Sequence, residues 1–87
     1  MSLKDDFEKA TQDVKNLSRR PADGELLELY ALYKQAVDGD VSGSRPGFLD
    51  LKGRAKFDAW TKKKGMSTDE AMVSYTAFAK TLISRLS

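Results

Sequence analysis

Residues 30–36 read YALYKQA, and they are followed by Gly-Asp at 39–40, Arg-Pro-Gly at 45–47 and KFDAW at 56–60. The first of these segments places two tyrosines and a lysine on adjoining parts of one helix, because positions three and four apart are neighbours on its surface. Glycine and proline then punctuate a loop that is poor in periodic apolar residues. This stretch therefore predicts two helices joined by a long loop, with aromatic rings and ammonium groups gathered along them.

Apolar periodicity and capping residues divide the whole chain into four helices. Apolar side chains recur at steps of three and four residues in the first and last segments. Asp23 and Asp50 are good N-caps, and Ser67 with Glu70 has the spacing of a capping box. We expect helices from residue 2 or 3 to 17, from 23 to 38, from about 50 to 64, and from 68 to about 86. No run alternates as a strand would, so the prediction is one all-α domain over residues 1–87.

The expected helix at 23–38 has an apolar arc that is wider than a surface helix needs. We expect this arc to contact two neighbours, or one neighbour and a ligand. It comprises Leu26, Leu29, Tyr30, Tyr33 and Val37, whereas the opposite face, which we expect to be solvated, comprises Glu28, Ala31, Gln35 and Asp38.

Composition excludes several classes of function. The chain has 87 residues, no histidine and no cysteine. Nucleophile systems that depend on histidine, and zinc sites built on nitrogen or sulfur ligands, are therefore impossible. The sequence also contains neither GxGxxG nor GxxxxGK[ST], so the usual glycine-rich phosphate loops are absent. Because no pair of carboxylates or lysine stands out as a catalyst, we expect no enzyme activity, no metal and no cofactor.

Charge and hydropathy indicate the surroundings in which the chain works. A net charge of +2 is small for a nucleic-acid-binding domain, so we expect no nucleic-acid partner. No apolar stretch is long enough to cross a bilayer. The first residues become acidic at once and show no signal peptide, and there is no cysteine for a disulfide framework, so we expect a cytoplasmic protein.

The tyrosines and lysines have two interpretations. In the ordinary one, Tyr30 and Tyr33 fill the edge of the core with their hydroxyl groups in water, while Lys34 extends past them into solvent. In the other, the rings and the ammonium group bind the base and phosphate of a nucleotide. Lys52 and Lys56 lie four residues apart and are either a solvated face or part of the same site. Lys15 and Tyr75 would complete such a site if the four helices converge.

The order and spacing of these residues resemble the acyl-CoA-binding protein family, also known as the diazepam-binding-inhibitor family. The resemblance covers nearly the whole chain, from Phe7 to Leu82. It rests on Phe7, Ala10, Val14-Lys15, Pro21-Ala22-Asp23, Leu29-Tyr30, Tyr33-Lys34-Gln35-Ala36, Gly39-Asp40, Arg45-Pro46-Gly47, Asp50, Gly53, Ala55-Lys56, Asp58-Ala59-Trp60, Gly65, the segment 67–71 and Tyr75.

The resemblance implies an up-down-down-up four-helix bundle with a groove that holds a long-chain fatty acyl-CoA ester. By position, Tyr33 would stack on adenine, while Tyr30, Lys34 and Lys56 would hold the ribose 3′-phosphate. Three further residues would line the nucleotide end, namely Lys15, Lys52 and Tyr75. The acyl chain would lie along apolar positions at Ala10, Leu26, Leu27 and Phe57. The family binds and carries its ligand without hydrolysing it.

Two departures and two alternatives accompany this resemblance. Gly24 stands where the family commonly has an acidic residue. Phe57 stands where the family usually has tryptophan, which removes an indole N–H and some contact area. We expect a monomer that makes transient contacts with acyl-CoA-using enzymes or membranes. The alternatives are an accessory domain of an acyl-CoA thioesterase or isomerase, and a small helical interaction or nucleic-acid-binding module without acyl-CoA affinity.

Overall fold

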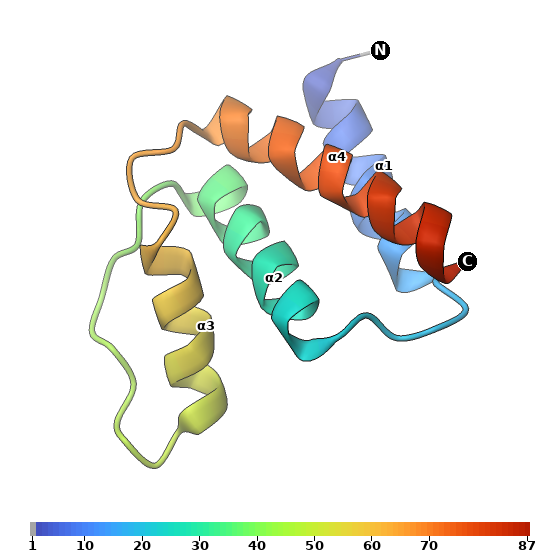
Figure 1. Cartoon of the computed structure of the whole chain (residues 1–87). Helices are drawn as coiled ribbons and strands as arrows, with labels where there is room; N and C mark the ends of the chain where they lie inside the picture. The colour runs from blue at the N-terminus through green and yellow to red at the C-terminus, as the bar shows by residue number, and fades with distance from the viewer. Residues whose placement is uncertain (1) are drawn as a thin grey trace.

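A computed structural model of the chain describes residues 2–87 and contains four helices and no strand in that range (Figure 1). The helices are α1 (Leu3–Lys15), α2 (Asp23–Asp38), α3 (Leu51–Thr61) and α4 (Thr68–Leu86). In Figure 1 α1 and α4 run down the page, whereas α2 and α3 run up it. Because α2 and α3 are parallel, the loop between them must return along the outside of the molecule. The predicted all-α fold and its long connection are confirmed.

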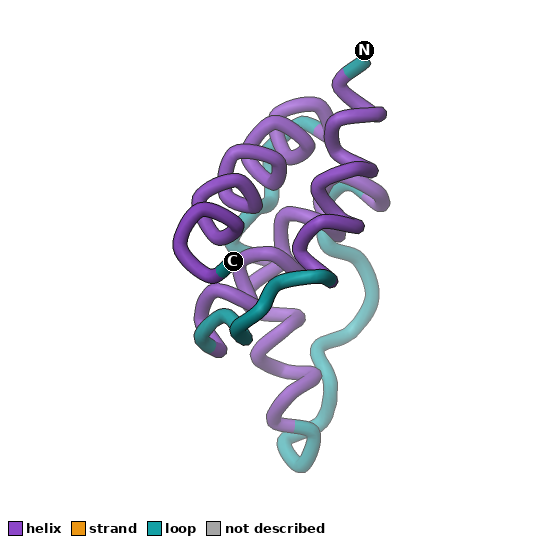
Figure 2. Tube along the Cα trace, turned by 90° about the vertical axis from the view of Figure 1, so that its right-hand side faces the viewer, coloured by secondary structure: helices purple, strands orange, loops and turns teal. Residues whose placement is uncertain are grey.

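The four helices form a flat molecule with principal extents of 37 × 28 × 15 Å. α2 lies in the middle and packs on both α4 and α3, while α1 packs on α4 (Figure 1). Figure 2 shows the long loop running down the outside of the helices to one end of the molecule. The buried core is made by α1, α2 and α4 alone and includes Phe7, Leu32, Tyr75 and Leu82. α3 buries only Trp60. It is therefore an outlying helix that is attached to one neighbour.

Side-chain caps begin three of the four helices, α1, α3 and α4. The Ser2 hydroxyl accepts a hydrogen bond from the Asp5 N–H (3.1 Å), and Asp50 accepts one from the Gly53 N–H (3.0 Å). Ser67 accepts from the N–H of Glu70 at 3.0 Å, and the Glu70 carboxylate accepts in return from the N–H of Ser67. Each of these bonds satisfies an N–H that the first turn of a helix leaves free. The predicted capping box is confirmed.

Two predicted helix ends and one predicted N-cap were wrong by one to three residues. Asp23 is the first residue of α2 and not its N-cap, because Glu25 accepts the N–H of Ala22 (2.9 Å) and starts the helix one residue earlier. α1 ends at Lys15 and α3 at Thr61, two and three residues before their predicted ends. The chain beyond them tightens into turns with bonds from residue i to i−3.

The predicted solvated face of α2 was wrong at Ala31 and Gln35, which are completely buried. Gln35 donates its amide hydrogens to Asp40 (2.8 Å) and to the carbonyl of Met66 (2.7 Å). Because α2 has neighbours on two sides, the expected solvated side is partly covered, whereas part of the apolar arc is open. Tyr33 on that arc is 42% exposed.

Polar contacts hold α3 in place. The indole N–H of Trp60 donates to the carbonyl of Gly39 at 2.9 Å, and Lys63 pairs with Glu28 of α2 at 2.7 Å. Arg45 of the connecting loop pairs with Asp58 of α3. These contacts fix the angle between α2 and α3, and that angle determines the groove described next. No helix within residues 2–87 is long and apolar enough to cross a membrane.

Candidate ligand-binding groove

An open groove of about 820 Å³ lies between the first halves of α2 and α3. Aliphatic side chains and aromatic rings share this groove with four charged groups at its edge, which is the usual composition of a site for a partly apolar ligand. The residues that line it are Arg20, Asp23, Leu26, Leu27, Leu29, Tyr30, Tyr33, Leu51, Lys52, Ala55, Lys56 and Tyr75.

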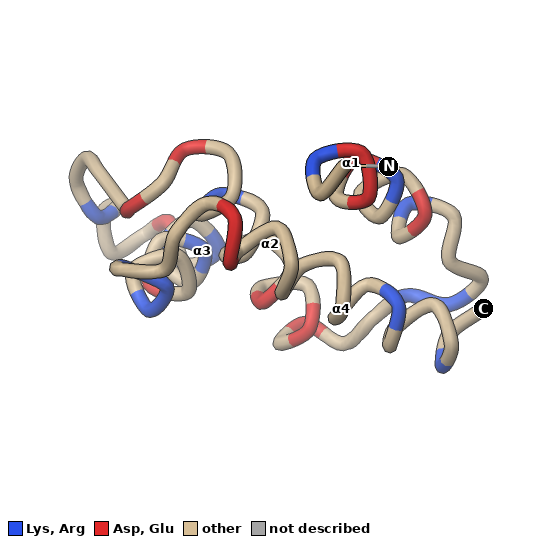
Figure 3. The backbone as a smooth tube through the Cα atoms, turned by 90° about the horizontal axis from the view of Figure 1, so that it is seen from above, with Lys and Arg blue, Asp and Glu red and all other residues tan. Residues whose placement is uncertain are grey.

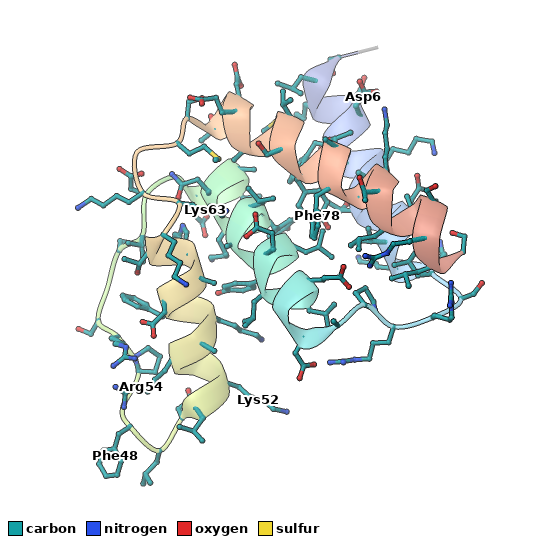
Figure 4. The ribbon with its side chains drawn as sticks, viewed as in Figure 1. Asp6, Phe48, Lys52, Arg54, Lys63 and Phe78 are labelled. Atoms are coloured by element: carbon teal, nitrogen blue, oxygen red, sulfur yellow. The ribbon has the colours of Figure 1, made fainter. Side chains whose placement is uncertain are left out.

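The parallel arrangement of α2 and α3 makes one end of the groove electropositive. Both helices begin here, and the N-terminal end of a helix carries a partial positive charge. Lys52 adds a full charge beside the two helix starts and extends from α3 on the side that faces α2 (Figure 4). The charge of Arg20 is compensated by Asp23, whose carboxylate lies 2.9 Å from it. The helix starts and Lys52 therefore make this end of the groove suited to an anion.

Lys56 and Tyr30 face each other across the groove. The Lys56 Nζ lies 5.4 Å from the centroid of the Tyr30 ring, which is within the range of a cation–π contact. Neither Lys52 nor Lys56 forms an ion pair with a carboxylate of residues 2–87. Their charges are therefore available to a ligand phosphate.

Three aromatic rings form a cluster beside the groove. Phe7 lies 5.9 Å from Tyr33 in a stacked arrangement and 5.1 Å from Tyr75 in an edge arrangement. Burial, with a smaller effect of Tyr33, raises the pKa of Tyr75 to about 12, so its hydroxyl remains protonated at neutral pH and is able to donate a hydrogen bond. Tyr33 is exposed on its other side. Phe7 and Tyr75 thus hold in place a ring that is open to a ligand.

Seven of the eleven residues that the resemblance singled out line this groove, and four do not. Lys34 forms an ion pair with Asp38, and its Nζ lies 4.9 Å above the Trp60 ring. The hydrogen bond to Asp38 raises the pKa of Lys34, so the ammonium stays charged. Ala10 is buried in the α1–α2–α4 core. Lys15 is exposed at the end of α1, and Phe57 is half-buried on α3.

Sequence reasoning missed the contribution of Arg20, Asp23 and Leu51 to the groove. Arg20 precedes Pro21 just before α2, Asp23 is the first residue of α2, and Leu51 is the first residue of α3. None of them belongs to an apolar periodicity. The feature that could have indicated these residues is the parallel arrangement of α2 and α3, because it brings the two helix starts together. Within residues 2–87, no cluster of three or more acidic side chains is placed to hold a metal ion.

The fold and the groove together define a small all-α domain that binds a ligand with an apolar part and an anionic part. The chain belongs to the acyl-CoA-binding protein family, because the profile of the family described as "Acyl CoA binding protein" matches residues 4–79. The predicted resemblance is confirmed.

Individual proteins support the same assignment. The chain is 53% identical to an acyl-CoA-binding protein homolog of Manduca sexta, over 99% of this chain and 97% of that protein. It is 46% identical to an acyl-CoA-binding protein homolog of Drosophila melanogaster, over 95% of this chain and 96% of that one. The crystal structure of acyl-CoA-binding protein 2 from Oryza sativa superposes with a TM-score of 0.92 at 39% identity, covering 97% and 93% of the two chains. The corresponding structure from Moniliophthora perniciosa gives a TM-score of 0.83 at 35% identity, covering 98% and 94%.

Proposed function

We propose that this chain binds long-chain fatty acyl-CoA esters in the groove between α2 and α3, and that it carries and stores them in the cytoplasm as a monomer. The observation that supports this most strongly is the groove itself. It joins leucine side chains to a rim of phenol and ammonium groups within one space of about 820 Å³. Membership of the family gives the class of ligand, since the relatives are named for acyl-CoA binding.

The nucleotide part of the ligand would lie between the middle turns of α2 and α3, where Lys56 and Tyr30 face each other. Lys56 and Tyr30 would contact the ribose 3′-phosphate, with Lys52 close by and the positive helix ends behind them. Tyr33 would stack on adenine, because its ring is open on one side and supported by Phe7 on the other. Stacking on an aromatic ring contributes ~1–3 kcal/mol per base.

Lys34 would have to leave Asp38 in order to reach the phosphate. Its ion pair with Asp38 is on the surface, and such pairs contribute only ~0–1 kcal/mol. A hydrogen bond to a charged phosphate contributes roughly 1.5–3 kcal/mol. The phosphate contact is the stronger of the two, so we propose that Lys34 changes partner when the ligand binds. Lys15 would approach the same end from α1.

The acyl chain would lie along Leu26, Leu27 and Leu29. Burial of a palmitoyl chain at ~0.8 kcal/mol per methylene contributes up to ~12 kcal/mol before ordering costs are subtracted. Nanomolar affinity needs about 12 kcal/mol in total. The nucleotide and the acyl chain of the ligand together therefore give high affinity, and esters with longer acyl chains bind more tightly. Phe57 and Ala10 lie outside the groove residues, so we propose that their contribution to the acyl site is indirect.

Calorimetric titration with palmitoyl-CoA, coenzyme A and palmitate tests the proposal. We expect palmitoyl-CoA to bind far more tightly than either part, because only the whole ester uses both ends of the groove. Equal affinity for palmitate would instead indicate a general fatty-acid carrier. The thioesterase alternative is tested by incubating the protein with palmitoyl-CoA and measuring free thiol. We expect release at the rate seen without protein.

A further inference from the structure

Three large apolar side chains protrude from the end of the loop that leads into α3. Phe48 is 73% exposed, Leu49 is 86% exposed and Leu51 is 73% exposed. We call these three residues the apolar tip. Figure 4 shows Phe48 at the extremity of the molecule, pointing away from the helices. Within one short segment this is more exposed apolar surface than folding requires, and such a patch usually marks a site of interaction.

The surroundings of the apolar tip are basic. Residues 41–65 contain seven of the fifteen basic residues of the chain and two of its thirteen acidic residues. Three of the seven, Lys52, Arg54 and Lys56, lie in the first two turns of α3, next to the tip. Both acidic side chains have partners within this segment. Asp58 pairs with Arg45, and Asp50 accepts a hydrogen bond from the Gly53 N–H at the start of α3. The rest of the chain has a net negative charge. Figure 3 shows the basic residues that run along α3 and its loop at one end of the molecule.

The apolar tip also adjoins the proposed ligand groove. Leu51 belongs to the tip and also lines the groove. Its neighbour Lys52 is not part of the tip but lines the groove as well. Phe48 and Leu49 do not line it. A surface that contacts the tip would therefore lie directly at the open end of the groove.

We propose that the apolar tip inserts into the surface of a lipid bilayer that contains anionic lipids, with the lysine and arginine side chains of α3 contacting the lipid headgroups. Apolar side chains flanked by cations bind such membranes through buried apolar area and electrostatic attraction. The groove then opens at the interface where acyl chains reside, and cargo enters or leaves there. This role in cargo exchange rests on the proposed binding of acyl-CoA.

The size of the apolar tip favours a membrane over a folded protein or a second copy of the chain. A stable protein interface buries ~800 Å² on each partner. Three side chains, at the ~150–250 Å² that a large aromatic buries, supply at most ~450–750 Å², which is less than that area. Insertion into a bilayer has no such requirement, because each protruding side chain enters the acyl region separately.

Co-sedimentation with vesicles tests the proposal. The full-length protein is mixed with vesicles of phosphatidylcholine and phosphatidylserine, and with vesicles of phosphatidylcholine alone. The test variant carries Phe48→Ser and Leu49→Ser, which leave the groove residues intact. The matched control carries Val37→Ser and Val73→Ser, two exposed apolar residues on α2 and α4 that lie outside the tip. All proteins are also titrated with palmitoyl-CoA in the absence of vesicles.

We expect the unmodified protein and the control to bind the anionic vesicles. The tip variant should bind at least about tenfold more weakly, because it lacks two of the apolar side chains that enter the bilayer. Raised salt and neutral vesicles should weaken binding, since both reduce the attraction of the basic residues. Equal binding by the tip variant and the unmodified protein would overturn the proposal. So would an unmodified protein that binds no vesicles, a result that would instead favour a protein partner for the tip.

The titration with palmitoyl-CoA separates failure of this proposal from failure of the proposed function. A tip variant that keeps its affinity for palmitoyl-CoA and loses the vesicles supports membrane docking. An unmodified protein that binds vesicles but not palmitoyl-CoA retains the membrane surface and contradicts the acyl-CoA function. A tip variant that loses both affinities equally would contradict a separate role for the tip.

Discussion

Replacement of Lys56 by glutamine tests the proposed phosphate contact at the groove. The Lys56 ammonium is exposed, has no carboxylate partner within residues 2–87, and lies 5.4 Å from the Tyr30 ring. A hydrogen bond to a charged group contributes roughly 1.5–3 kcal/mol, and the exposure of Lys56 favours the lower end of that range. A loss of about 1.5 kcal/mol weakens binding roughly tenfold. We therefore expect Lys56→Gln to bind palmitoyl-CoA about ten times more weakly.

The assay is calorimetric titration with two ligands, palmitoyl-CoA and its analogue without the 3′-phosphate. In such a cycle, groups that interact give non-additive losses, whereas independent groups give additive ones. We expect Lys56→Gln to weaken binding of palmitoyl-CoA while leaving the affinity for the analogue nearly unchanged. Lys80→Gln is the matched control, since Lys80 is an exposed lysine on α4 outside the groove. Equal losses for both ligands would refute a contact between Lys56 and the 3′-phosphate.

Four further predictions concern binding and stability. Tyr33→Ala should weaken palmitoyl-CoA binding tenfold or more in the same titration, because ~1–3 kcal/mol of stacking is lost, and an unchanged affinity would exclude stacking. Lys34→Ala should also weaken it about tenfold, because a phosphate contact of roughly 1.5–3 kcal/mol is lost; reduced thermal stability with unchanged affinity would show that Lys34 has only a structural role. Gln35→Leu should destabilise the fold by ~1–3 kcal/mol in urea, because it removes the Gln35 donor from the Met66 carbonyl and one of the two donors from Asp40, and an unchanged unfolding midpoint would contradict this. Lowering the pH should also destabilise the contacts around Asp40, and Trp60 fluorescence measures this change. Hydrogen bonds from the Gly65 N–H and from Gln35 hold the pKa of Asp40 below 3.8, so its stabilisation is complete above that pH and disappears as the pH falls through the lowered value. An acid transition identical in Asp40→Asn would contradict the assignment.

The helices were predictable because the signals for their ends are local. Ser67 and Glu70 cap each other across a single turn, and Asp50 caps the turn that follows it. Local signals are weaker at the helix ends that fray, which is why α1 and α3 end earlier than expected. The apolar arc identified Leu26 as a candidate for a ligand surface and the family resemblance added Leu27, and both line the groove.

The remaining features depend on contacts between segments far apart in the sequence. Gln35 looks like a surface residue of α2, yet it is buried because Asp40 and the Met66 carbonyl reach it from two loops. Arg20 has no periodicity to mark it, and it joins the groove only because α3 begins beside α2. Lys34 was assigned by resemblance, whereas its partners Asp38 and Trp60 are visible only in the structure.

The central claim is that the whole acyl-CoA ester occupies the single groove between α2 and α3. Amide chemical-shift changes during titration with palmitoyl-CoA test it most directly, because they report binding residue by residue. We predict that the largest changes fall at the starts of α2 and α3 and around Tyr33 and Tyr75, with one set of bound signals. Changes concentrated on the outer faces of α1 and α4, with Leu26, Tyr30 and Lys56 unaffected, would contradict it.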